Sequence, residues 1–340
     1  MHDPVVGKPH ANTWMEMPMK INGLTIKILN RVRRMLGNGI YRDSEGPFLP
    51  VDYFGEAAGH LIYDHLMSSQ PCMVARFGRS EMITLRRAWF GRGKRVSAKV
   101  LGFLRGDHGP FWWEQVHLDL LHQTAGVFPR NVKTLRMFSQ RYFEDMQLID
   151  VLGSLSPGEA DLAALLHLAR VIPIADMEPF WAQQPWTRAL QGKVVLVIHP
   201  FDQSIKFQYT KRESLFRNSA TLPLFELHTL RPVWSAGGQD GGFRSWSDAL
   251  DWMCGQMETI EFDVALIGAG AYGLPLAAHA KRMGRKAVHL GGALQLLFGI
   301  KGKRWDSRTS YQNLYNEHWM RPMKAETPAS NTQVEGGCYW

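Results

Sequence analysis

The chain has 340 residues, of which 45% are hydrophobic and 21% are charged, a composition typical of a folded protein with a sizeable core. Its formal net charge of +8 favours anionic partners such as nucleotides or phospholipid surfaces. The 3 cysteines are too few and too scattered for a disulfide framework or a zinc site. No stretch approaches the roughly 18 uninterrupted apolar residues of a membrane span. The N-terminus also lacks the layout of a secretory signal, so we expect a cytoplasmic protein.

The N-terminal segment differs in pattern from the rest of the chain. Residues 1–18 show no regular pattern, whereas apolar residues recur at helical spacing among lysines and arginines from Lys20 to Leu36. This pattern predicts a basic amphipathic helix, which either lies on an anionic membrane surface, at its inner face, or docks on the protein's own core. We therefore divide the chain into an N-terminal extension (1–50), an α/β domain (51–322) and a polar C-terminal tail (323–340).

Strand patterns alternate with helix patterns through the central part of the chain. Short apolar runs predict strands at 72–77, 193–198, 262–267 and 286–292. Helical spacing predicts helices at 54–67, 81–89, 111–122, 141–152, 157–169 and 245–257, and another helix from about Ile205. Such alternation predicts a Rossmann-like α/β fold, in which helices cover both faces of a mainly parallel sheet.

A glycine turn follows the strand at 262–267. Its spacing fits G-x-G-x-x-G, which points backbone N–H groups and a helix N-terminus at a phosphate. In this interpretation Gly268 and Gly270 permit close backbone approach, Gly273 lets the helix pack against the sheet, and Tyr272 stacks on a base or sugar. A dinucleotide site would place an acidic residue after the next strand, but that strand ends in His-Leu-Gly-Gly at 289–292. The sequence thus favours a phosphate site over a nicotinamide site.

Ligands of open parallel sheets bind beyond the carboxyl ends of the strands, so two further strand ends are candidates. At the end of the strand at 72–77, Arg76 and Arg79 suit a phosphate, and Glu81 suits a metal ion or a proton. After the strand at 193–198, His199 and the polar residues that follow it either bind ligand oxygens or are solvated. The candidate residues at these two ends are Arg76, Gly78, Arg79, Glu81, His199, Ser204 and Gln208. His199, Asp202 and Ser204 are too close in sequence for the usual separated catalytic triad.

The C-terminal third contains two less specific candidates. Lys301, Lys303 and Arg304 form a basic cluster beside Trp305, which suits either a pyrophosphate clamp or a solvated loop. Farther on, Glu317 or His318 could act as a general base, although both residue types also serve structural roles.

Two of these elements resemble a known family. Arg76-Phe77-Gly78-Arg79-Ser80-Glu81 resembles the Arg-Phe-Gly-Asp-Gly-Glu element of the GT-D-type glycosyltransferases. The unit from Val264 to Gly292 is similar to that family's second nucleotide-side element, with His289-Leu290-Gly291-Gly292 where the family has Asp-Ile-Gly-His. The resemblance runs from about residue 55 to about residue 305.

The resemblance implies a glycosyltransferase that uses a nucleotide-diphosphate sugar in cell-surface polysaccharide or glycoconjugate assembly. Its acceptor would be a glycan or a lipid-linked sugar, and nucleic acid is not an expected partner. Family members bind Mn²⁺ or Mg²⁺ through the Asp-X-Glu element, of which this chain keeps only Glu81. Arg79 replaces the aspartate and could neutralise the diphosphate itself. Two alternatives remain open, a non-catalytic sugar-nucleotide-binding module and an NAD(P)-dependent oxidoreductase.

Overall fold

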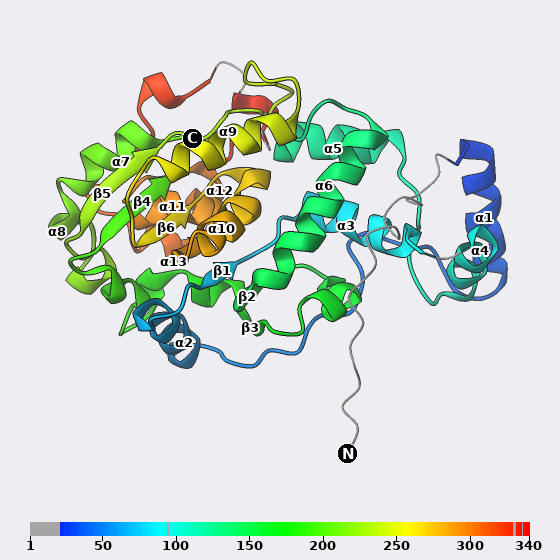
Figure 1. The fold of residues 1–340 in the computed structure, drawn as a ribbon, viewed down its shortest axis with the longest axis horizontal. Coiled ribbons are helices and arrows are strands. Elements are labelled where there is room, and N and C mark those ends of the chain that lie inside the picture. The colour runs from blue at the N-terminus through cyan, green and yellow to red at the C-terminus, as the bar shows by residue number, and fades with distance from the viewer. Residues whose placement is uncertain (1–20, 94, 329–330, 335) are drawn as a thin grey trace.

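The fold is a single parallel sheet with helices on both faces (Figure 1). The computed structural model describes residues 21–93, 95–328, 331–334 and 336–340. The segment 1–18, predicted to be irregular, and Lys20 at the start of the predicted basic helix lie outside these residues. Every strand pairing in the sheet is parallel, which confirms the predicted α/β class.

The sheet has 7 strands in the order β3-β2-β1-β7-β6-β4-β5. They are β1 (Met73–Ala75), β2 (Val151–Ser154), β3 (Arg170–Pro173), β4 (Val194–Ile198), β5 (Glu226–Leu230), β6 (Val264–Ile267) and β7 (Lys286–His289). The four strands predicted from sequence are β1, β4, β6 and β7. They lie next to one another at the centre of the sheet, because β6 and β7 insert between β4 and β1. Their carboxyl ends therefore meet at one edge, although they lie far apart in the chain.

Helices connect the strands and cover both faces of the sheet. The longer ones are α1 (Gly23–Met35), α2 (Glu56–Met67), α3 (Arg79–Gly91), α4 (Val96–Arg105), α5 (Gln115–Ala125), α6 (Val132–Asp145), α7 (Asp202–Tyr209), α9 (Trp246–Glu258) and α10 (Gly273–Arg282). Four single-turn helices are α8 (Arg212–Leu215), α11 (Leu294–Leu297), α12 (Lys303–Asp306) and α13 (Thr309–Gln312). One face is covered by α3, α5, α6, α9 and α10, and the other by α2, α7, α8, α11 and α12.

The central strands are apolar on both faces because both faces are covered. In β4, Leu196 and Ile198 pack on the α3–α10 side, whereas Val195 and Val197 pack on the α2–α7 side. All four side chains are fully buried, and each such aliphatic side chain contributes about 1.5–3 kcal/mol to folding. This two-sided burial explains why β4 is a continuous apolar run in the sequence.

Two of the predicted helices are partly wrong. The predicted helix at 141–152 covers the end of α6 and then β2, and the one at 157–169 is a 3-10 helix at Glu159–Leu165 that leads into β3. Asp150 marks the change into β2, because its carboxylate accepts hydrogen bonds from the amide of Met73 (2.8 Å) and from Lys281 (2.7 Å). Both partners are distant in sequence, so the local apolar spacing could not reveal the strand.

The predicted basic helix is α1, and it packs against α4 at the edge of the molecule, away from the sheet (Figure 1). Ile26 and Leu29 bury their side chains beside Phe103 of α4, and the Arg33 guanidinium donates to the carbonyl of Phe103. Among the described helices, none combines the length and the apolar character needed to cross a membrane.

Candidate functional site

A cavity of about 750 Å³ lies at the carboxyl ends of β1, β7, β6 and β4. Its size falls in the usual range of small-molecule sites. Most of the residues that the sequence singled out are brought together there. Those lining it are Arg76, Gly78, Arg79, Glu81, His199, Gly268, Gly270, Tyr272, His289, Gly291 and Gly292.

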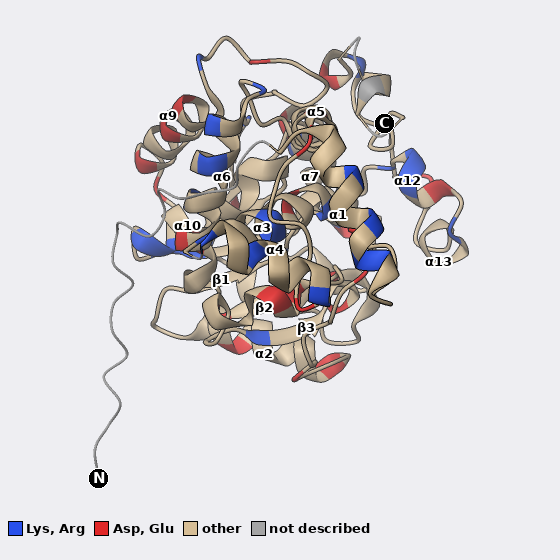
Figure 2. Ribbon diagram, turned by 90° about the vertical axis from the view of Figure 1, so that its right-hand side faces the viewer, with Lys and Arg blue, Asp and Glu red and all other residues tan. Residues whose placement is uncertain are grey.

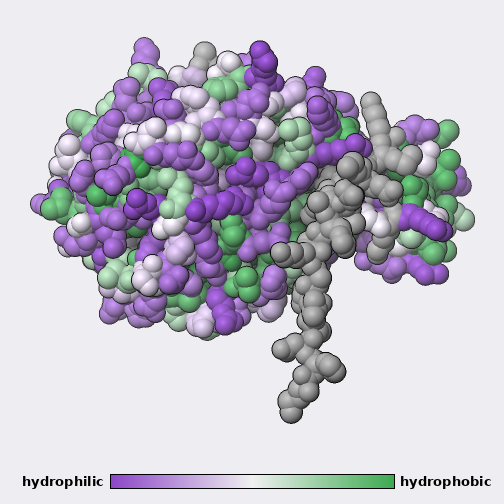
Figure 3. Space-filling model, in the orientation of Figure 1, coloured by the Kyte–Doolittle hydropathy of each residue, from purple (hydrophilic) through white to green (hydrophobic). Residues whose placement is uncertain are grey.

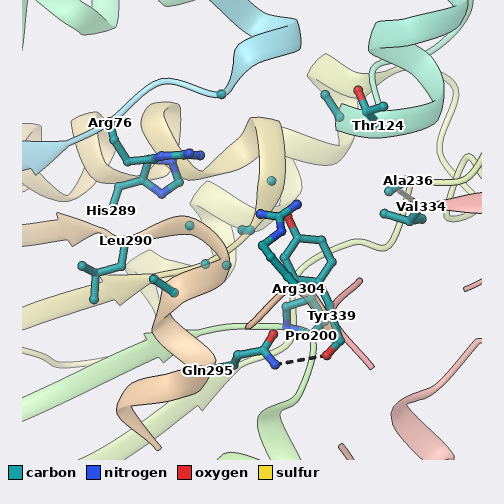
Figure 4. A pocket seen from close by; sticks show the side chains of 18 of the residues that line it. Arg76, Thr124, Pro200, Ala236, His289, Leu290, Gln295, Arg304, Val334 and Tyr339 are labelled. Atoms are coloured by element: carbon teal, nitrogen blue, oxygen red, sulfur yellow. Dashed lines mark hydrogen bonds between the residues drawn. The ribbon is translucent and has the colours of Figure 1, made fainter. Parts of the chain in front are cut away.

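Arg76 follows β1 and places its guanidinium against the end of β7. A Cβ atom added to Gly291 would lie 3.2 Å from Nη1 of Arg76, and Figure 4 shows the Arg76 side chain beside the ring of His289. Nε of Arg76 is buried and has no hydrogen-bond partner. Among the described residues, Arg76 forms no ion pair. A half-buried cation without a fixed partner is well placed to bind an anion.

Three glycines that line the same cavity have free backbone amides. Among the described residues, the N–H groups of Gly270, Gly291 and Gly292 have no protein acceptor. Gly270 and Gly291 have φ values of +54° and +62°, which side-chain-bearing residues rarely adopt. Successive amides in such turns form anion-binding concavities. The amides and Arg76 together form a binding surface suited to phosphate.

Gly268 and Gly273 serve packing instead. A Cβ on Gly268 would lie 2.6 Å from the ring of His199, and one on Gly273 would lie 2.1 Å from the ring of His289. The amide of Gly268 is already bonded to the carbonyl of Ile198 at 2.8 Å. The expectation that Gly268 approaches a ligand is therefore corrected, because His199 fills that space. Gly273 does not line the cavity, and the absence of a side chain there makes room for His289 of β7.

Tyr272 also differs from its expected role. Its ring is buried and stacks on Trp246, with centroids 5.5 Å apart, and its hydroxyl pairs with Ser235 at 2.9 Å. Since the ring face is already covered by Trp246, Tyr272 shapes the cavity wall but does not offer that face to a base or sugar.

The two histidines of the cavity are neutral. Burial lowers the pKa of His199 to about 3, and burial with the nearby charge of Arg76 lowers the pKa of His289 to about 3. Nδ1 of His199 accepts from the amide of Phe201 (3.0 Å), which leaves Nε2–H as a donor. Nδ1–H of His289 donates to the carbonyl of Ile267 (3.2 Å), which leaves Nε2 as an acceptor. The pair supplies directed hydrogen-bonding groups without positive charge.

Glu81 and Arg79 lie in the first turn of α3. Glu81 is buried, and its carboxylate accepts a hydrogen bond from Ser80 at 3.1 Å, whereas Arg79 is exposed. Within the described part of the chain, no three His, Cys, Asp or Glu side chains group as a metal site. A single carboxylate beside an arginine does not fit Mg²⁺ or Mn²⁺, which prefer several oxygen ligands.

Aromatic side chains form a continuous part of the cavity wall. Neighbouring ring centroids lie 5.6 to 6.4 Å apart. We call this set the aromatic wall; it consists of Phe201, Trp234, Trp305, Tyr311, Tyr339 and Trp340. The C-terminal residues are held there by the bond from Gln295 to the carbonyl of Tyr339 (3.1 Å, Figure 4). Gly292 makes room for the Tyr339 ring, since a Cβ there would lie 2.4 Å from it.

Glu178 is a cavity residue that the sequence did not reveal. It follows β3, and its Oε2 atom accepts from Trp181 and from Tyr311, both at 2.8 Å. Burial raises the pKa of Glu178, partly offset by these two hydrogen bonds and by Arg308. Neither Glu178 nor Arg308 belongs to a motif. Only their long-range contact through Tyr311 identifies them, so the sequence held no usable signal.

Several predicted residues lie outside the cavity. Ser204 donates to Glu326 and accepts from the amide of Met323 (2.9 Å), and Gln208 donates to the carbonyls of Gly299 (3.1 Å) and His318 (3.0 Å). Both side chains are fully buried in structural contacts, which corrects their placement on the sugar side. The remaining residues outside the lining are Lys301, Lys303, Glu317 and His318, whereas Arg304 of the basic cluster does line the cavity.

Comparison with known proteins adds no relative. No family model matches the chain, and neither a curated protein nor a solved structure matches it.

Proposed function

We propose that the protein is a glycosyltransferase that binds a nucleotide-diphosphate sugar and transfers the sugar to a glycan or lipid-linked acceptor. One observation carries the proposal: a single cavity is lined by Arg76, by the buried carboxylate Glu81 and by three glycines whose amides have no acceptor among the described residues, Gly270, Gly291 and Gly292. The resemblance of segments 76–81 and 264–292 to GT-D-type enzymes supports it.

The diphosphate lies against Arg76 and the glycine amides, where positive charge and N–H donors stabilise the leaving group. Glu81 takes the proton of the acceptor hydroxyl while that oxygen attacks the anomeric carbon. The bond from the anomeric carbon to the phosphate oxygen breaks, and the nucleoside diphosphate leaves with both bonding electrons. Arg79, exposed at the cavity rim, adds charge compensation, and no step is assigned to a metal ion.

The aromatic wall provides apolar surface for sugar rings, whose C–H faces pack on aromatic faces. Glu178, at the end of this wall, has its Oε1 atom free of the two hydrogen bonds that end on Oε2. A hydroxyl group of the sugar or of the acceptor binds there.

A thermal-shift panel of nucleotide sugars, with and without Mn²⁺, tests the proposal. At a hundred times its dissociation constant, a ligand adds about 2.7 kcal/mol to the free energy of unfolding, so a true donor raises the melting temperature by several degrees. We expect the same shift with and without Mn²⁺. Absence of a shift with every nucleotide sugar overturns the proposal.

The second candidate is a non-catalytic sugar-nucleotide-binding module, favoured by the single carboxylate in the first turn of α3. Glu81→Gln separates the two functions. For a transferase, this variant keeps donor binding but loses hydrolysis and transfer by roughly 10²–10⁴-fold, the usual contribution of a general base. If the wild-type protein binds a donor but neither hydrolyses nor transfers it, the protein is the non-catalytic binding module.

A further inference from the structure

Helix α1 has two apolar faces, and only one of them is covered by the protein. Ile26, Leu29 and Arg33 face α4 and are buried. Leu24, Ile28 and Met35 lie on the opposite face, because residues spaced four and seven apart share a side of a helix. They are exposed by 70%, 53% and 78%. The apolar spacing seen in the sequence thus belongs largely to the solvent side.

Basic residues border this outward face. Lys27, Arg31 and Arg34 are exposed alongside Leu24, Ile28 and Met35, and α1 contains no acidic residue. Figure 2 shows α1 facing the viewer with blue segments and no red. Figure 3 shows apolar side chains at the surface of the part formed by α1 and α4, at the edge of the molecule. Leu36 (58%) and Ile40 (65%), which follow α1 in the chain, are also exposed.

We propose that this outward face of α1 binds the surface of an anionic lipid bilayer. The apolar side chains would enter the boundary between headgroups and acyl chains, and the basic side chains would meet the phosphates. Long Lys and Arg side chains reach headgroups while their stems stay in apolar contact. The charged residues that border this face are all basic, with no acidic residue on α1, which matches an anionic surface. This inference does not depend on the proposed transferase activity.

Vesicle co-sedimentation tests the proposal with the full chain. We expect the protein to sediment with vesicles that contain phosphatidylglycerol and to stay in solution with phosphatidylcholine alone. The double variant Leu24→Ser, Ile28→Ser should weaken binding by about tenfold or more, because it removes buried apolar area. The matched control is Leu168→Ser, Leu224→Ser, whose leucines are exposed by 69% and 53% elsewhere on the surface. This control should bind as the wild type does.

A triple substitution of the basic residues gives a second, independent test and leaves the apolar side chains unchanged. Lys27→Gln, Arg31→Gln, Arg34→Gln together should abolish most binding to the anionic vesicles. The control Lys206→Gln, Arg217→Gln, Arg231→Gln removes the same charge from other exposed positions and should bind as the wild type does.

Three outcomes overturn the proposal. In the first, the wild-type protein does not sediment with anionic vesicles. In the second, each control weakens binding as much as its α1 counterpart. In the third, light scattering shows a dimer that Leu24→Ser, Ile28→Ser dissociates, which makes the face an interface between two copies. Circular dichroism melting of every variant confirms that it is folded.

Discussion

Arg76 is a residue that we predict to be unfavourable for stability and necessary for binding. Its Nε is buried without a partner, which costs free energy in the unliganded protein. We therefore expect Arg76→Met to leave the free energy of unfolding unchanged or higher, and to weaken nucleotide-sugar binding by about tenfold or more. Urea unfolding and titration calorimetry measure the two effects.

Arg87 is the matched control, because its Nε is also buried without a partner, whereas both of its Nη atoms are hydrogen-bonded. It donates to both carboxylate oxygens of Asp43 (2.8 and 2.9 Å) and to the carbonyl of Trp112 (3.0 Å). Arg87→Met should destabilise the protein by about 3–5 kcal/mol, since it removes the bidentate partner of Asp43 and leaves that carboxylate, among the described residues, with only His117, at 3.6 Å. If Arg76→Met costs as much stability as Arg87→Met, Arg76 is a structural residue.

Glu178 predicts a pH dependence of stability. Burial raises its pKa above the ordinary value of 4.5, so the folded protein holds the proton more tightly than the unfolded chain. Its stabilising contribution is complete below pH 4.5 and is lost as pH rises through the folded-state pKa. Glu178→Gln keeps an oxygen acceptor for Trp181 and Tyr311 without the charge. We expect this variant to melt higher than the wild type at pH 7 and equally at pH 4, in thermal unfolding followed by circular dichroism. A difference that is the same at both pH values would contradict this.

At the scale of elements, the C-terminal segment holds the start of α7. Glu326 accepts hydrogen bonds from the amides of Gln203 (2.8 Å) and Ser204 (3.1 Å), in the first turn of that helix. The carboxylate thus serves as an N-terminal cap supplied from a distant part of the chain. The C-terminal tail, in its described residues, lines the cavity through Val334, Tyr339 and Trp340.

Removing this cap should lower the free energy of unfolding without altering the part of the cavity lined by Arg76 and Gly291. We expect Glu326→Ala to lower the free energy of unfolding by about 2 kcal/mol, the upper value for a lost cap, and to leave the buried Ser204 hydroxyl without its acceptor. The control Glu317→Ala removes an exposed carboxylate and should change stability by less than about 0.5 kcal/mol. Urea unfolding compares the two, and equal effects would refute the capping role.

At the scale of the whole molecule, the strand order brings four segments that are distant in sequence to one cavity. If one ligand spans them, a saturating nucleotide sugar should slow amide hydrogen exchange at 76–81, 199–201, 268–273 and 289–293 together. The opposite edge of the sheet, at 148–150 and 260–263, should exchange as before. Mass spectrometry of peptic fragments measures this, and protection of a single segment would show that the cavity does not bind the ligand as a unit.

Much of the central architecture can be predicted from the sequence. β4 and β6 are predicted because two-sided burial demands an unbroken apolar run, and glycine must follow where φ is positive, as at Gly270. The short β2 is not predicted, because a strand of four residues that closely follows a helix is too short to show the alternating hydrophobic pattern of a strand. The same limit applies to β3 and to β5, whose residues are only partly buried.

The sequence by itself determined the α/β class, the four central strands and the glycine, arginine and glutamate residues at their ends. These features are local, since each depends on the conformation of a few consecutive residues. Only the tertiary structure decided which side chains face the cavity. Ser204 is hydrogen-bonded to Glu326, and Tyr272 stacks on Trp246. Glu178 lines the cavity and is hydrogen-bonded to Tyr311. Each of those outcomes depends on a partner distant in the chain, whose position is set by the packing of the whole sheet.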